Sequence, residues 1–517
     1  MKKYIFIAIA ALSVASCKLD DNISPNDPGV EQVTPDLYLS AAQTSNYNVE
    51  VGDVFELSNV WMNNWAGNIY YFASPYSAEY QLQITSAFAR GNNFWNNGYT
   101  AMARYAAIYN NPQISKYPHH GAIAKILMAN SMQYIVDFYG DAPFSEAFKR
   151  EANLTPKYDK GEDIYRNLVL MINEAVQTIN TTTPQFEVGT EDEIFDGNMA
   201  QWKKLANTVK LRLLLRQSKV TDPTIKAFVN AQLQTLQGAE FITEADGDVS
   251  INPGYNNSNA AQQNPLIRNY AWLNFDQSAE NINGYRLIDI SSHFAGLLNG
   301  TNAKTTGIAD GRRGIMYRAV GGTIRGINQG EGQIPGATEA SFSRMAWRFR
   351  EVNQAGTAWA ENSGIDGVVM SVSESELLQA EAAELYPAIF TNAIGHYNQA
   401  IISSFRAFGL AATAATTYTN NLSTRPYGWN GADGHIAAIQ YQRMIALHYV
   451  KPQETYINYL KTGYPLTPLA LTATQPNKPW RLVYPAREYN TNSSNVPNVT
   501  QSDVFVKNQF TPFWNRN

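Results

Sequence analysis

Apolar residues recur at helical spacing in three stretches of the N-terminal half of the chain. The first stretch, 123–135, ends at a Gly-Asp-Ala-Pro sequence, and a second stripe covers 164–179. A third covers 202–213 and follows Asn198, a residue type that caps first helical turns. A period near 3.6 residues places such positions on one helix face, which can pack against a core. The pattern therefore predicts three amphipathic helices.

The same spacing returns in the C-terminal half, where it predicts two helix pairs. One pair consists of 373–386, in which Ser373 and Glu376 have the spacing of a capping box, and 393–408. Gly409 stops the second of these helices. Another pair occupies about 435–461. Helix pairs of this length resemble tetratricopeptide repeats, which must stack on their neighbours to bury their apolar faces.

The middle of the chain, about 245–369, has a different pattern. It is rich in Gly, Asn and Gln, and its periodic stretches are short. We expect long loops there, with short helices and a few strands. The predicted fold is mainly α: tetratricopeptide-like helix pairs over about 80–217 and 371–461 form a scaffold, and the middle forms a loop-rich side. The Pro- and Asn-rich tail from Leu466 onward is expected to wrap the body.

The N-terminus has the pattern of an exported protein. Lys2 and Lys3 precede an apolar run that reaches about residue 15 and is followed by Ser16 and Cys17. Because this run is about half the length of a membrane-spanning helix, it predicts a signal peptide over 1–16. Small residues before a cysteine resemble a bacterial lipobox, which predicts lipidation of Cys17. The alternative is an ordinary signal peptide followed by a chance cysteine.

The rest of the chain is expected to form one domain attached through the lipid. Cys17 is the only cysteine in the chain, so no internal disulfide explains its presence. Polar residues and prolines over 17–35 indicate a tether. No later run of 18 apolar residues was found, so the acyl chains are the expected membrane attachment. Residues 36–517 are interpreted as a single domain.

Composition narrows the class of ligand. Charged residues make up 16% of the chain and aromatic residues 12%, with a formal net charge of −5. Without a basic patch, nucleic acid is not expected as a partner. Low charge with many Tyr, Trp and Asn side chains suits neutral polar ligands such as oligosaccharides or peptides, although most of the rings are expected to fill the core.

No catalytic or metal-binding motif is visible, so we expect no cofactor and no enzyme activity. The six histidines lack a metal-ligand partner at recognisable spacing. The pairs Glu374–Glu376 and Asp246–Asp248 could be imagined as glycosidase carboxylates. Such pairs are common by chance, and their separation along the chain does not give their separation in space. A surface glycan hydrolase with an unrecognised site therefore stays the alternative.

An ordered set of segments is similar to motifs of the SusD/RagB family of outer-membrane lipoproteins. Each segment alone is weak, but together they follow the order of the family and extend to about residue 490. The segments are YGDAPFSEA at 139–147, FDG at 195–197, WKKLAN at 202–207, LRLLLR at 211–216, ELLQAEA at 376–382, TGYP at 462–465 and RLVYP at 481–485, with Glu488. Lys461 stands before TGYP where the family usually has arginine.

This resemblance implies a non-catalytic nutrient-binding protein with four irregular tetratricopeptide-like helix pairs. It also implies delivery of oligosaccharides or peptides to a SusC-like TonB-dependent transporter. The acidic pair Asp20-Asp21 after Cys17 is similar to a surface-export signal, which implies a lipid-anchored place on the outer membrane. The motif residues themselves are interpreted as structural. Arg212 and Arg216, four residues apart on one face, could pair with acidic residues such as Glu381 or Glu384.

Two stretches combine Trp and Tyr with amides outside the helical stripes, as a sugar or peptide site requires. One is 61–76 and the other is the loop-rich middle. The family builds its ligand side from an early segment and this same middle region, which supports the choice. If Trp61 and Trp65 instead form one helical face, they are buried. The residues predicted to bind ligand are Trp65, Asn68, Tyr70, Tyr71, Asn64, Trp272, Tyr270 and Trp347.

Overall fold

The computed structural model describes residues 33–69, 76–149, 152–274, 279–347 and 364–516. The described residues confirm a mainly α fold, with short strands. Cys17 and nearly all of the predicted tether lie outside the described residues. The helices of the first half are α2 Pro35–Glu50, α3 Asp53–Trp61, α4 Ser77–Gln81, α5 Ala89–Tyr109, α6 Pro118–Tyr139, α7 Gly161–Thr181, α8 Met199–Arg216 and α9 Pro223–Gln234.

The later elements show the predicted change of pattern at the middle of the chain. The helices there are α10 Pro265–Tyr270, α11 Ser292–Asn299 and α12 Arg313–Met316. The C-terminal helices are α14 Val372–Leu385, α15 Ala393–Ala407, α16 Ala412–Leu422, α17 His435–Leu447, α18 Pro452–Thr462 and α19 Ala486–Thr491. The strands are β1 Trp65–Gly67, β2 Val249–Ile251, β3 Ile288–Ile290 and β4 Gly367–Met370.

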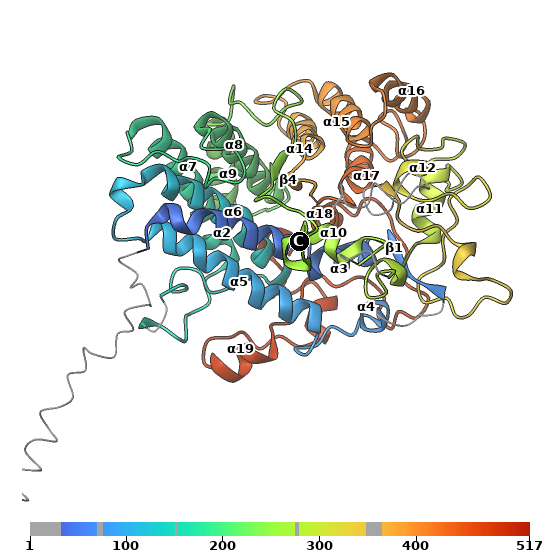
Figure 1. Cartoon of the computed structure of the whole chain (residues 1–517), viewed down its shortest axis with the longest axis horizontal. Helices are drawn as coiled ribbons and strands as arrows, with labels where there is room; N and C mark the ends of the chain where they lie inside the picture. The colour runs from blue at the N-terminus through green and yellow to red at the C-terminus, as the bar shows by residue number, and fades with distance from the viewer. Residues whose placement is uncertain (1–32, 70–75, 150–151, 275–278, 348–363, 517) are drawn as a thin grey trace, which may run out of the picture.

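The long helices pack in chain order and form one continuous scaffold (Figure 1). In the first half α5 contacts α6, α6 contacts α7 and α7 contacts α8. In the second half α14 contacts α15, α15 contacts α16, and α17 contacts both α14 and α18. The halves meet where α8 packs on α14, and α18 packs back on α3. The apolar stripes that predicted these helices are their buried faces.

Helix ends follow local chemistry, with one correction to the predicted caps. The Asn198 side chain accepts the backbone N–H groups of Ala200 and Gln201, which confirms it as the cap of α8. The predicted cap at Ser373 is wrong. Strand β4 keeps the chain extended through Ser371, whose hydroxyl accepts the N–H of Glu374 at 3.1 Å. Ser373 lies inside α14 and donates to a carbonyl of α15.

Several helices have no apolar stripe that the sequence pattern revealed. The clearest case is α2, whose buried face carries Gln43, Asn46 and Glu50 beside its apolar residues. Asn46 donates to Glu50, and Gln43 donates to Asp192 at 2.8 Å. Because buried polar side chains interrupt the stripe, periodicity alone did not predict α2. Helices α9 and α16 were likewise not predicted.

The loop-rich middle is joined to the scaffold by two small antiparallel sheets. Strand β1 pairs with β3, with Trp65 opposite Ile290. Strand β2 pairs with β4, with Val249 opposite Met370. The β1–β3 sheet connects the middle to the segment after α3, and the β2–β4 sheet pairs the two ends of the middle just before α14.

The C-terminal tail lies along helix α6 and the loop after it. The N–H of Leu482 donates to the carbonyl of Phe138, and the Tyr484 hydroxyl donates to that of Asp141, both at 2.6 Å. Near the end of the chain, the Trp514 indole donates to Asp137 at 2.8 Å. These contacts agree with the expectation that the tail wraps the body.

Buried ion pairs join the two halves of the scaffold, through partners other than those predicted. Arg212 pairs with Glu374 at 2.6 Å, and Arg216 pairs with Glu454 at 2.8 Å and Asp137 at 3.2 Å. Neither arginine forms an ion pair with Glu381 or Glu384, the partners considered from the sequence. Linear spacing showed that the two guanidinium groups share a face of α8 but not which later helix faces them.

Candidate ligand-binding site

The two stretches predicted to form a ligand site do meet, but inside the protein. Trp65 lies on β1 with 0% of its surface exposed, and its ring packs edge-on against Tyr270 with centroids 5.3 Å apart. Tyr270 is 3% exposed, and Asn64 and Asn68 are fully buried. Buried side chains cannot stack on a ligand in this conformation. Ligand binding by these four residues remains a prediction, and their burial argues against it.

The other predicted residues have different positions. Trp272 and Trp347 are half-buried, and the Trp347 ring lies parallel to Tyr449 with centroids 5.8 Å apart. Tyr70 and Tyr71 lie outside the described residues. Trp61, at the end of α3, is 3% exposed, so the burial considered as an alternative for Trp61 and Trp65 is what the structure shows, although Trp65 is on a strand.

A different group of aromatic and amide side chains lines a pocket of about 340 Å³, called here the aromatic pocket. Three segments contribute: one face of α5, the loop between α6 and α7, and α19 with the residue after it. The lining residues are Trp95, Asn96, Tyr99, Thr100, Pro143, Ala147, Phe148, Asn153, Leu154, Pro156, Arg487, Glu488, Thr491 and Asn492.

Local chemistry holds the loop of the aromatic pocket in place. Helix α6 ends at Gly140, whose φ of 77° is unfavourable for residues with a Cβ, and such an atom would lie 3.0 Å from the carbonyl oxygen of Phe510. The chain then turns at Asp159, whose backbone pairs with Ala142. The Asp159 carboxylate accepts the N–H groups of Phe144 and Ser145. These contacts fix the conformation of the loop.

The pocket combines aromatic faces with hydrogen-bonding groups. The rings of Trp95 and Phe148 both pack near Tyr99, with centroids 4.9 Å and 5.8 Å from its ring. The Tyr158 hydroxyl donates to Glu488 at 2.7 Å and fixes that carboxylate at the edge. Burial, reinforced by the charge of Glu488, raises the pKa of Tyr99 and of Tyr158 well above their usual value. Both phenols therefore stay protonated at neutral pH.

A match to a protein-family model establishes the class to which this chain belongs. The model described as "Starch-binding associating with outer membrane", SusD-like, matches residues 27–485. The chain belongs to the SusD-like family. A comparison with curated proteins found no match.

Solved SusD-like structures share the fold over nearly their whole length. A chitin-binding SusD homologue from Flavobacterium johnsoniae has 18% identity and a TM-score of 0.67, covering 92% of this chain and 98% of its own. A SusD-like protein of Bacteroidetes AC2a has 20% identity and a TM-score of 0.70, covering 93% and 100%. A SusD homologue from Bacteroides vulgatus has 18% identity and a TM-score of 0.69, covering 92% and 97%.

The aromatic pocket of this SusD-like chain was missed in the sequence for a physical reason. The segment 139–147 and Glu488 were recognised as family motifs but interpreted as structural. Asp141 does have such a role, because it accepts the N–H of Gly161 at the start of α7. The rings of Tyr99 and Phe148 come from segments far apart in sequence, and no spacing indicates that they meet. The signal that was available is the non-periodic stretch 143–156, which contains Phe148 and Asn153.

The carboxylates considered for hydrolysis are held by neighbouring side chains or backbone. Glu374 pairs with Arg212, and Glu376 contacts His396 at 2.7 Å. Asp246 pairs with Lys204 at 2.6 Å, and Asp248 accepts the N–H of Val372. Within the aromatic pocket, the only carboxylate among the lining residues that are described is Glu488, whereas glycoside hydrolysis generally uses two.

The residues that the structure describes contain neither a membrane-spanning helix nor a metal site. None of the helices in this part of the chain has the length and apolar content that crossing a membrane requires. No group of three or more His, Cys, Asp or Glu side chains there has the arrangement of a metal site.

Proposed function

We propose that this SusD-like chain is a surface lipoprotein that binds oligosaccharides or peptides and delivers them to a SusC-like TonB-dependent transporter. The observation that carries the proposal is the family match over residues 27–485, with its outer-membrane description. The lipobox ending at Cys17 supports attachment by acyl chains, which do not require a membrane-spanning helix.

Carbohydrate is the first ligand class to test. Two structural relatives are described as chitin-binding, and the family description names starch. The aromatic pocket has the chemistry such ligands need, since sugar rings offer flat C–H faces to aromatic rings and hydroxyls to amides, carboxylates and guanidinium groups. Peptides can use the same groups, so both classes belong in the experiment.

Calorimetry on the soluble chain without its signal peptide tests ligand class and location together. The probes are chitin oligosaccharides, starch oligosaccharides and a mixture of short peptides. Phe148→Leu removes a ring from the aromatic pocket, and Trp272→Leu removes one from the loop-rich side. Phe186→Leu is the matched control, because this ring is 44% exposed and stacks on Tyr117 outside both regions.

The variant that weakens binding identifies the site. Loss of one stacking ring corresponds to about 1–2 kcal/mol, or roughly a ten-fold rise in Kd. A loss confined to Phe148→Leu assigns the aromatic pocket, and one confined to Trp272→Leu assigns the loop-rich side. Failure of every probe to bind would contradict the nutrient-binding proposal. Appearance of cleaved products during incubation would instead favour the hydrolase alternative.

Anchoring and partnership require a separate experiment in cells. Cys17→Ala should abolish metabolic fatty-acid labelling and release the protein from the membrane. Wild-type protein should co-purify from detergent-solubilised outer membranes with a large TonB-dependent transporter. Continued labelling of Cys17→Ala would contradict the lipobox assignment, and purification of the wild type without a transporter would contradict the delivery step.

A further inference from the structure

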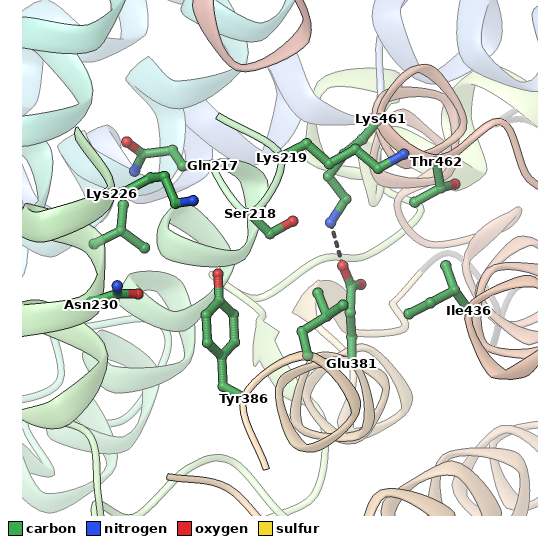
Figure 2. Close-up of a pocket in the computed structure, with 12 residues that line it drawn as sticks. Gln217, Ser218, Lys219, Lys226, Asn230, Glu381, Tyr386, Ile436, Lys461 and Thr462 are labelled. Carbon is green, nitrogen blue, oxygen red and sulfur yellow. Dashed lines mark hydrogen bonds and ion pairs between the residues drawn. The ribbon is translucent and has the colours of Figure 1, made fainter. Parts of the chain in front are cut away.

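A second pocket, of about 490 Å³, opens between the turn after α8 and helices α9, α14, α17 and α18, and Figure 2 shows its lining residues. It is called here the cationic pocket and shares no lining residue with the aromatic pocket. Its walls come from the turn after α8, from α9, α14 and α18, and from the start of α17. The lining residues are Gln217, Ser218, Lys219, Lys226, Val229, Asn230, Glu381, Leu385, Tyr386, Ile436, Lys461 and Thr462.

The floor of the cationic pocket is a buried charge cluster. Lys461 and Glu381, which are 4% and 1% exposed, form an ion pair, and Glu381 also accepts from Arg443 at 3.0 Å. Burial alone would raise the pKa of Glu381, but Lys461 and Arg443 outweigh it and lower the pKa to about 2. Burial lowers the pKa of Lys461 to about 8, although Glu381 opposes that shift, so the Lys461 ammonium is still charged at neutral pH.

The mouth of the pocket adds further positive charge. Lys219 and Lys226 are exposed, and neither forms an ion pair with an acidic side chain among the described residues. Of the lining side chains, three are cationic and one is anionic. In Figure 2 the hydroxyls of Ser218 and Tyr386 point into the same space as the Lys461 ammonium. Val229, Leu385 and Ile436 supply apolar wall between these groups.

We propose that the cationic pocket binds a small organic anion whose oxyanion group is attracted by the exposed ammonium groups of Lys219 and Lys226 at the mouth, above the Lys461–Glu381 ion pair of the floor. Its volume lies within the roughly 300–1,000 Å³ of small-molecule sites, and a low-dielectric floor strengthens attraction to the excess charge. Ser218, Asn230 and Tyr386 offer hydrogen bonds to the rest of the ligand, and the apolar wall covers its carbon skeleton.

The lysines define the charge of the ligand but not the shape of its oxyanion. An ammonium acts as a point charge, whereas a guanidinium fork selects planar carboxylates by two parallel hydrogen bonds. A carboxylate and a phosphate are therefore both acceptable sources of the charge. The experiment uses glucuronate and glucose 6-phosphate to distinguish them, and neutral glucose as the probe with the same ring and no charge.

Calorimetric titration of the soluble full-length mature chain is expected to show binding of at least one of the two anions and much weaker binding of glucose. Raising the salt concentration from about 0.05 M to about 0.5 M should weaken anion binding, since salt screens the mouth lysines. Lys219→Gln with Lys226→Gln should raise Kd about ten-fold. Asn230→Trp, which fills the mouth without changing charge, should also weaken binding.

Matched variants separate this site from general electrostatic attraction. Lys116→Gln removes one exposed ammonium from the 3-10 turn η3 Ile114–Lys116, which contributes nothing to the pocket, and should leave Kd unchanged. All of these lysines and Asn230 are exposed, so folding is expected to be preserved. Anion binding no tighter than that of glucose, an equal effect of Lys116→Gln, or no effect of the pocket variants would each overturn the proposal.

Discussion

The helical scaffold and the loop-rich middle satisfy their buried polar groups in different ways. In the scaffold, buried charges pair with each other between helices, as Arg212 does with Glu374 at 2.6 Å. The middle also buries ion pairs, such as Arg312 with Asp310 at 2.7 Å, but it adds buried or half-buried amides that bond to irregular main chain. Gln329 donates to the carbonyls of Val60 and Trp65, both at 2.7 Å. The difference follows from the backbone, because helices satisfy their own N–H and C=O groups and irregular loops do not.

The high Asn and Gln content of the middle has a structural explanation. Asn281 accepts the N–H of Gly284 and donates to the carbonyl of Asn269. Asn264 caps α10 by accepting the N–H of Leu266 and also donates to the carbonyl of Ile365. Such side chains take the place of regular secondary structure. Their abundance therefore marks a region of irregular backbone and does not by itself indicate a ligand surface.

The largest expected difference between the two regions concerns tryptophan in the core. Trp202 on α8 is fully buried, its ring packs edge-on against Phe195, and its indole donates to Asp192 at 2.7 Å. Trp202→Ala should lower the free energy of unfolding by about 4 kcal/mol. Trp272→Ala in the half-buried middle should cost much less. Urea unfolding of both variants measures this, and equal losses would remove the contrast.

The second prediction tests the buried charges of the scaffold. Glu454 accepts from Arg216 at 2.8 Å and lies 3.5 Å from Arg212. Burial would raise the pKa of Glu454, but the two arginines lower it to about 2. Glu454→Gln leaves the guanidinium groups undercompensated in the core and should cost about 3 kcal/mol in unfolding free energy.

An exposed pair supplies the control for Glu454→Gln. Lys125 and Glu174 are 2.5 Å apart, but the Glu174 side chain is 60% exposed. Glu174→Gln should change the free energy of unfolding by less than about 1 kcal/mol, because water screens exposed ion pairs. If the two glutamine variants have the same urea midpoint, the buried network contributes no more than a surface pair.

Prediction from the sequence succeeded to different degrees in the scaffold and in the loop-rich middle. Helices α6, α7, α8 and α15 were predicted because apolar residues recur along each of them at helical spacing, even where polar side chains are buried beside that stripe. Helix α2 was not predicted because Gln43, Asn46 and Glu50 interrupt its stripe. Trp65 and Tyr270 come from the two stretches predicted to meet, and they do meet, but as core. The pattern showed which segments are unusual, whereas burial depends on contacts between distant residues.

The pockets lay beyond prediction for a related reason. The aromatic pocket requires α5, the 143–156 loop and α19, and the cationic pocket requires the turn after α8 and four further helices. Lys461 was recognised in sequence only as a departure from arginine in a family motif. Its pairing with Glu381 depends on how α18 faces α14. Helical periodicity predicts the face of each helix but not the angle at which two helices meet.

The third prediction concerns the seam between the two regions, where Lys478 of the tail lies between α18 of the scaffold and α11 of the middle. Lys478 in the tail is 4% exposed, donates to Thr467 and lies over the Tyr459 ring of α18. Its positive charge also acts on His293 of α11. Burial lowers the pKa of Lys478 to about 7 from 10.5. Between pH 7 and pH 10.5, Lys478 is protonated in the unfolded chain and deprotonated in the folded chain. The free energy of unfolding therefore increases as the pH rises through this range.

Comparison of the wild type with Lys478→Met isolates that contribution, because other titrating groups cancel. From about pH 7 to pH 9 the wild type should gain about 2 kcal/mol relative to the variant. Urea unfolding at a series of pH values provides the measurement. A constant difference across this range would show that Lys478 keeps its ordinary pKa and that the seam is open to water.

The smallest expected effect tests whether the two regions unfold together. Ser291 caps α11 in the middle by accepting the N–H of Phe294, and Ser371 caps α14 in the scaffold in the same way. Each serine-to-alanine variant should cost about 1 kcal/mol. Because α11 is short and anchored by loops, Ser291→Ala should speed hydrogen exchange mainly within α11. Ser371→Ala should speed it also in α15 and α17, which pack on α14. If both variants change exchange across the whole chain alike, the middle and the scaffold form one cooperative unit, and their difference lies only in how each satisfies its buried polar groups.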